Sequence, residues 1–313
     1  MGLSMIITRF SFLLLSLSKL ILAQPPAPLT HETTEHTTTV ADKFKPSPSN
    51  TNQSTLSKYL EQDAKLHSFL ASTIPSALEH TGSSDFDSHL KGVQSVLRYW
   101  KSSKDLTNAG LFHSIYGTEG FQGYALPLSY RSDVISLIGE RAERLCWTFC
   151  MIDRYTVDEA VLGLVSNRRL LSRPELGRFK ITLSDDEWYD FLELTLADWL
   201  EQVEGASRTS STLFHWKKGE AYAYRRYAYQ QMAELLSARE PDRLNVTMEM
   251  VEAVYGMEAE ETRGLIQMKT PPMSEAAERA YEALRSADGD VEVPDHWGPI
   301  LMVDERMNDA AEL

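Results

Sequence analysis

A hydrophobic period typical of α-helices runs from Thr55 to Leu236. Apolar side chains recur there three or four residues apart, which places them along one face of an α-helix. Runs of β-branched residues with a period of two, which would predict strands, are nearly absent. We therefore predict an all-α fold.

The period divides this region into separate helices. The expected helices cover 56–75, 89–100, 106–116, 131–139, 140–153, 184–203 and 220–239. Ser184 followed by Glu187 is a capping box that predicts the start of the sixth. Gly117 and Pro241 are stop signals after the third and the last.

The N-terminus has the pattern of a secretory signal peptide. Arg9 precedes a mostly apolar run over 10–23, and Lys19 leaves that run short for a bilayer span. We expect a signal peptide at 1–23, a secretory or extracellular location, and no stable membrane span after cleavage. The alternatives are an uncleaved anchor, or a wrong start codon and a cytoplasmic protein.

The remaining chain of 313 residues divides by composition. Residues 24–55 are rich in Thr, Pro, Ser and Asn, which predicts a disordered linker. A helical domain at 56–240 follows, and then an acidic extension at 241–313 with a helix at 274–287. From Asn245 onward 16 acidic and 5 basic residues supply most of the net charge of −14. Such an acidic chain is a poor partner for nucleic acid or an anionic membrane.

Two cysteines, Cys146 and Cys150, lie four residues apart on an expected helix. A helix holds such a pair on one face but is a poor frame for a disulfide. We interpret both as small apolar packing residues rather than as a crosslink.

Two histidines fall on helices in otherwise apolar surroundings. His89 lies on an expected helix face with Val93 and Val96, and His113 follows Leu111-Phe112. A buried helical histidine is usually a hydrogen-bonded core residue. Two such residues from neighbouring helices, with carboxylates nearby, are also what Mn²⁺, Fe²⁺ or Zn²⁺ requires.

Several segments resemble the histidine-aspartate (HD) superfamily of helical metal-dependent phosphohydrolases and diiron oxygenases. They are SHLKGVQSVLRYW, NAGLFHSIYG, YRSDVISLIGERAERL and LELTLADWLEQV. Over roughly 80–205 the chain is still more similar to the domain of unknown function 6817 family. The segments HTGSSDFDSHLKGVQSVLRYW, AGLFHSIYGTEGF and LIGERAERL carry this likeness.

The resemblance implies an HD-like helical bundle with His89, His113 and Asp198 as metal ligands. His80 joins this motif set, or else is a surface turn residue. Ser114 stands where the superfamily has the aspartate that bridges two metal ions, so we expect one divalent ion (Fe, Mn or Zn) rather than two. Glu119 is a candidate fourth ligand or general base, with Ser114 beside the reaction centre.

The implied function is metal-dependent hydrolysis of a phosphate ester. The alternatives are an iron-dependent oxygenase, or a non-catalytic HD-like domain that binds a small molecule or a protein. Arg131, Arg141 and Arg144 are candidates for contacting a small anionic substrate, or else belong to solvated helix faces. The sequence specifies no oligomeric state.

Overall fold

The computed structural model confirms an all-α fold. It describes residues 38–74, 86–118, 126–165, 168–210, 216–239, 241–263 and 265, with side chains left out at 175 and 241–246. The α-helices in this part are α1 (Gln53–Thr73), α2 (Phe86–Tyr99), α3 (Lys104–Phe112), α4 (Arg131–Ile138), α5 (Glu140–Met151), α6 (Arg154–Val161), α7 (Asp185–Ala206), α8 (Arg226–Arg239) and α9 (Pro241–Tyr255). The expected signal peptide and the helix at 274–287 lie outside the described residues.

Short elements connect these helices. The 3-10 helices are η1 (Ala41–Phe44), η3 (Leu128–Tyr130), η4 (Pro174–Leu176), η5 (Glu220–Ala223) and η6 (Glu260–Thr262). The strands in the described residues are β1 (Leu170–Leu171) and β2 (Lys180–Ile181), which pair antiparallel with Leu170 opposite Ile181. None of the described helices is both long enough and apolar enough to span a membrane.

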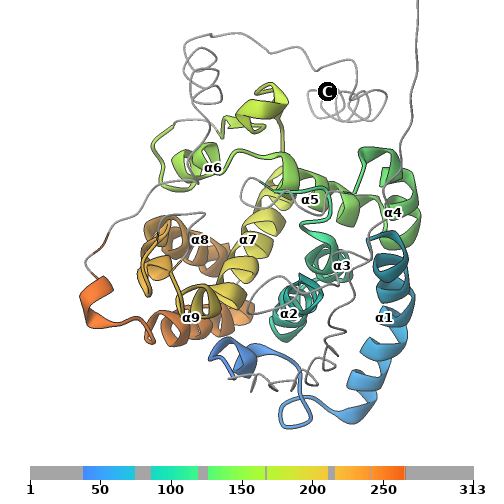
Figure 1. Cartoon of the computed structure of the whole chain (residues 1–313), viewed down its shortest axis with the longest axis horizontal. Coiled ribbons are helices and arrows are strands. Elements are labelled where there is room, and N and C mark those ends of the chain that lie inside the picture. Colours follow the sequence, from blue (N-terminus) through green and yellow to red (C-terminus); the bar gives the residue numbers. More distant parts are fainter. Residues whose placement is uncertain are drawn as a thin grey trace, which may run out of the picture. The chain divides into compact units, whose positions relative to one another are not determined.

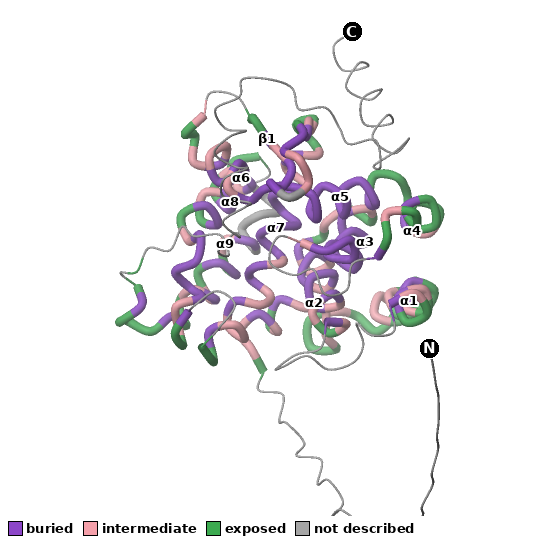
Figure 2. The backbone as a smooth tube through the Cα atoms, turned by 45° about the horizontal axis from the view of Figure 1, so that its top comes forward, coloured by how far each residue is buried: buried purple, intermediate pink, exposed green. Residues whose placement is uncertain are grey.

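Helix α7 is the centre of the packing. It contacts α2, α3 and α5 as well as α8 and α9, and Figures 1 and 2 show it between these two groups. The predicted capping box is present: the Ser184 hydroxyl accepts from the Glu187 backbone N–H, and the Glu187 carboxylate accepts from the Ser184 backbone N–H. Half of its residues are buried, including Phe191, Leu194 and Leu200. This helix therefore offers side chains to both halves of the core.

Helix boundaries differ from the prediction in several places, most of all at α8, which begins at Arg226 after η5 rather than at Glu220. The third helix ends at Phe112 rather than at Tyr116, and a turn leads on toward Gly117. The fifth ends at Met151, because Asp153 caps α6 by accepting from the Tyr155 backbone N–H. Helix α6 and the small sheet were not expected.

Residues 38–55 also differ from the disorder predicted for 24–55. Phe44 is buried and packs edge-on against Tyr99 of α2, with ring centroids 5.8 Å apart. The Val40 backbone N–H donates to Glu204 of α7 at 2.6 Å. One aromatic anchor and contacts with distant helices offset the low apolar content of this stretch.

Helix α9 begins at Pro241, where a division between domain and extension was expected. Proline suits the first position of a helix because that position needs no backbone N–H. Met250 and Val254 of α9 are fully buried, and the helix packs against α8 and α7. The packed body therefore continues past 240.

Candidate metal centre

Three helices bring His89, His113 and Asp198 together. His89 lies in the first turn of α2, at the N-terminal end of the buried stripe that includes Val93. His113 follows α3 and is fully buried. Asp198 lies in the interior of α7. The His89 and Asp198 side chains keep 17% and 16% of their surface exposed, so these two residues are not completely buried.

A close approach of α3 to α2 helps to position His113. A Cβ atom at Gly110 would lie 2.6 Å from Leu97 Cδ1 and 3.2 Å from the Gln94 Cα, so a larger residue would require the Leu97 side chain to move and the α2 backbone to shift slightly. The Gly110 carbonyl also accepts a hydrogen bond from His113 Nδ1 at 2.8 Å. Position 110 thus combines a close approach of the two helices with a backbone carbonyl that orients the His113 ring.

The three candidate ligand atoms form a nearly equilateral triangle. His89 Nε2 lies 3.3 Å from His113 Nε2 and 3.1 Å from Asp198 Oδ1, and His113 Nε2 lies 3.2 Å from the same oxygen. Ligands about 2.1 Å from one ion lie about 3.0 Å apart in cis octahedral positions and about 3.4 Å apart in a tetrahedron. The observed distances fall between these values, so the group could hold a metal ion.

The outer nitrogen of each ring has a partner that sets its tautomer. His89 Nδ1 lies 2.8 Å from Glu201 Oε2, and His113 Nδ1 lies 2.8 Å from the Gly110 carbonyl. Because both partners are acceptors, both Nδ1 atoms carry the proton. This leaves each Nε2 as the inward-facing atom, which is how metal-binding histidines are commonly oriented.

Without a metal ion, protonation of His89 explains why its two ring nitrogens lie close to the Asp198 and Glu201 carboxylates. Burial alone would lower the pKa of His89, but hydrogen bonds and charge from Asp198 and Glu201 raise it to about 10. Burial alone would raise the pKa of Asp198, but the two histidines hold it well below its usual range. The metal-free group is therefore an ion pair in which His89 donates from both ring nitrogens.

The other predicted site residues either lie beside the ligand group or fall outside the described residues. Ser114 is buried beside His113, and its backbone carbonyl accepts from the Gly117 backbone N–H at 3.0 Å. His80 and Glu119 lie outside the described residues. Glu201 was not predicted, although it lies three residues after Asp198, a spacing that puts both on one helix face.

The arginines considered for an anionic substrate are all in ion pairs. Arg131 pairs with Glu143, Arg141 with Asp190, and Arg144 with Glu187. Arg131 and Arg144 are buried, and only Arg141 is largely exposed. Their main role in the described structure is to link α4, α5 and α7.

The two cysteines are free and fully buried, as predicted. Cys150 Sγ donates to the His113 carbonyl at 3.0 Å, and Cys146 Sγ donates to the Ala109 carbonyl at 3.6 Å. Burial raises the pKa of the Cys150 thiol to about 12. They are thus packing residues that support α3 and the turn after it.

Part of the chain matches a known protein family. The family model described as Domain of unknown function (DUF6817) matches residues 69–154, a segment that includes both histidines and ends before Asp198. Neither the curated proteins nor the solved structures contain a match to the chain. The matched segment contains α2, α3 and the two histidines, and the family description assigns no activity.

Proposed function

We propose that this protein binds one divalent metal ion through His89, His113 and Asp198 and uses it to hydrolyse a phosphate ester. The observation that carries the proposal is the triangle of Nε2, Nε2 and Oδ1 atoms, 3.1–3.3 Å apart. Both histidines are held with Nε2 inward by separate acceptors. A histidine in a protein core needs only one hydrogen-bond partner. Here three atoms that can act as metal ligands point toward one position.

Each residue of the site would have a separate role in hydrolysis. His89, His113 and Asp198 would hold the ion, and the partial exposure of the His89 and Asp198 side chains would give water and substrate access to it. A bound divalent ion would polarise a phosphoryl oxygen and lower the pKa of a bound water. Ser114 replaces a bridging carboxylate, which favours one ion over two. Glu119 is the proposed general base and Ser114 a proposed hydrogen-bonding partner.

The electrostatics favour a small substrate whose charge the ion neutralises. The three candidate arginines already pair with carboxylates, and Glu201 adds a further negative charge beside His89. An anionic substrate would therefore depend on the ion for its binding. We propose that the chain is secreted, with 1–23 as the signal peptide, and that the substrate is a small phosphate ester of that compartment.

An iron-dependent oxygenase is the second candidate function, and the identity of the three ligands is the observation that supports it. Two histidines and one carboxylate on one face of an ion, with open positions opposite, are typical of non-haem Fe(II) oxygenases. Both functions need the same three residues. They differ in the ion that the protein retains.

Elemental mass spectrometry on protein purified without a metal-affinity step tests the proposal. We expect near-stoichiometric metal in the wild type and none in His113→Ala. His67→Ala is the matched control, because His67 lies on α1 outside the group and its loss should leave the metal in place. Zinc or manganese directs the assay to phosphate esters, and iron directs it to oxygenation. No metal after reconstitution would overturn the proposal in favour of a non-catalytic binding domain.

A further inference from the structure

Glu201 lies outside the ligand triangle and contacts it directly through His89. It lies on α7 one turn after Asp198 and accepts from His89 Nδ1 through Oε2 at 2.8 Å. Its other oxygen, Oε1, lies 3.1 Å from Lys45 Nζ. The carboxylate is 12% exposed. Each of its two oxygens therefore has a different charged or polar partner.

Gly92 of α2 makes the space that this carboxylate occupies. A Cβ atom built at Gly92 would lie 2.2 Å from Glu201 Oε1 and 2.6 Å from its Cδ. Glycine weakens the interior of a helix relative to alanine, so its presence here needs a packing reason. The reason is that the Glu201 carboxylate lies directly against the α2 backbone, one turn from His89.

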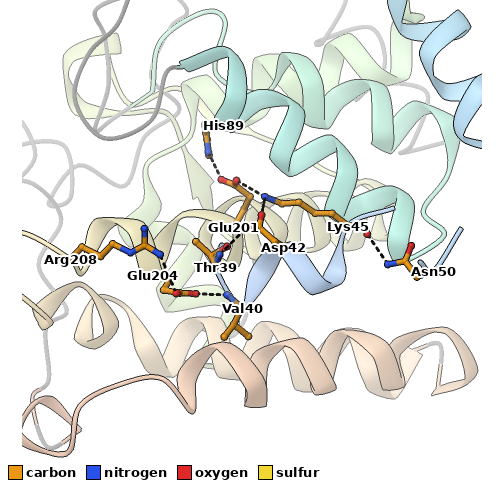
Figure 3. Close-up of polar contacts among 9 residues, drawn as sticks. All are labelled: Thr39, Val40, Asp42, Lys45, Asn50, His89, Glu201, Glu204 and Arg208. Atoms are coloured by element: carbon orange, nitrogen blue, oxygen red, sulfur yellow. Dashed lines mark hydrogen bonds and ion pairs between the residues drawn. The ribbon is translucent and has the colours of Figure 1, made fainter. Parts of the chain in front are cut away.

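Lys45 reaches Glu201 from a segment far away in the sequence. Its Nζ lies 2.9 Å from Asp42 Oδ1 and 3.1 Å from Glu201 Oε1, so two carboxylates hold one ammonium group (Figure 3). Phe44, the preceding residue, is buried and anchors this segment on α2. Figure 3 shows the continuous path from Asp42 through Lys45 and Glu201 to His89.

We infer that Gly92, Glu201 and Lys45 form a positioning device for His89 that sets the metal affinity of the site. This inference rests on the proposed metal site. A carboxylate on Nδ1 keeps the proton there, makes Nε2 more basic and holds the ring toward the ion. Gly92 admits the carboxylate, and Lys45 keeps it from turning away. None of the three contacts the ion, so they are positioning residues.

Titration of the metal-free protein with Co²⁺ tests this role, because the visible spectrum of Co²⁺ reports its coordination as well as its affinity. Glu201→Gln keeps the size of the side chain and removes its charge. We expect it to weaken Co²⁺ binding roughly 10- to 100-fold, the usual cost of losing such a partner. Lys45→Met should weaken binding less, and Lys43→Met, an exposed lysine of η1, is its matched control.

Gly92→Ala tests the position of the Glu201 carboxylate without changing Glu201 itself. The atoms that the new methyl group meets are the flexible end of Glu201, so the fold should accommodate it, and the metal-free protein should lose only the stability that the contact between Glu201 and His89 contributes. The displaced carboxylate should nevertheless weaken Co²⁺ binding as Glu201→Gln does. In Gly92→Ala/Glu201→Gln the two effects should not add, because both break one contact. Gly205→Ala, at a helical glycine with open space around it, is the control.

The outcomes distinguish the inference from the proposed function. A wild type that binds no Co²⁺ overturns the proposed function and the positioning role with it. A wild type that binds Co²⁺, with unchanged affinity and spectrum in Glu201→Gln and Gly92→Ala, overturns the positioning role alone. Equal weakening of Co²⁺ binding in Gly205→Ala also contradicts it. Selective loss of affinity in these two variants, with Gly205→Ala unchanged, supports it.

Discussion

At the scale of single residues, either a proton or a metal ion can hold the His89, His113 and Asp198 group together. Without a positive charge among them, two unprotonated Nε2 atoms and a carboxylate oxygen would face one another at 3.1–3.3 Å. The raised pKa of His89, about 10, is the consequence in the metal-free protein. A bound cation would replace this proton, since ligand nitrogens must be deprotonated.

The stability of the metal-free protein should therefore depend on the His89 proton. A group whose pKa is raised by folding stabilises fully below its unfolded pKa, and this contribution disappears as the pH rises through the folded value. For His89 the window is pH 6.5 to about 10. The lowered pKa of Asp198 keeps its contribution constant there, because that carboxylate stays ionised in both states.

We expect the difference in unfolding free energy between wild type and His89→Gln to shrink as the pH rises across this window. Urea denaturation in the presence of a chelator at several pH values measures it. A difference that stays constant from pH 6 to pH 10 would show that folding does not raise the pKa of His89.

At the scale of elements, α7 decides where the site lies. It carries Asp198 and Glu201 on one face and packs against helices on both sides. Its first turn is held by the Ser184 and Glu187 capping box, and Glu187 also pairs with Arg144 of α5. The start of α7 is thus fixed locally and by tertiary contact, about four turns before Asp198.

Ser184→Ala should lower the free energy of unfolding by about 1 kcal/mol, because the Glu187 backbone N–H loses its acceptor. Chemical denaturation of the metal-free protein measures this, and Co²⁺ affinity should not change because Asp198 is distant from the cap. Ser57→Ala, at an exposed position of α1, should stay within about 0.5 kcal/mol of the wild type. Equal effects of the two substitutions would contradict the role of the cap.

The elements also show what the sequence can predict. The helical period and the capping box were enough for the fold class and for α7, because both are local. His89 and His113 stood out as polar residues on apolar helices, whereas Asp198 depended on the family resemblance. Gly92 and Glu201 could not be foreseen, because their roles come from a contact between helices that are far apart in the chain. The fold of 41–44 was missed because buried Phe44 and contacts with distant helices stabilise a stretch that has few large apolar residues.

At the scale of the whole molecule, the proposed ion would join segments that the chain keeps far apart. His89 and His113 come from α2 and the turn after α3, whereas Asp198 comes from α7, which also contacts α8 and α9. An ion bound by all three would connect one half of the core to the other. Because unfolding separates these ligands, binding should stabilise the entire packed body rather than one helix.

Addition of Co²⁺ should therefore raise the melting temperature of the metal-free protein. At about 100 times the dissociation constant, ligand binding adds about 2.7 kcal/mol, which corresponds to roughly 5–10 °C for a body of this size. Differential scanning fluorimetry measures the shift, and it should grow with the logarithm of the ion concentration. His67→Ala should show the full shift, and His113→Ala and Asp198→Asn should show none. A shift of equal size in Asp198→Asn would mean that Co²⁺ binds at another place, because that variant keeps the shape of the site and lacks only the charge of its one carboxylate ligand.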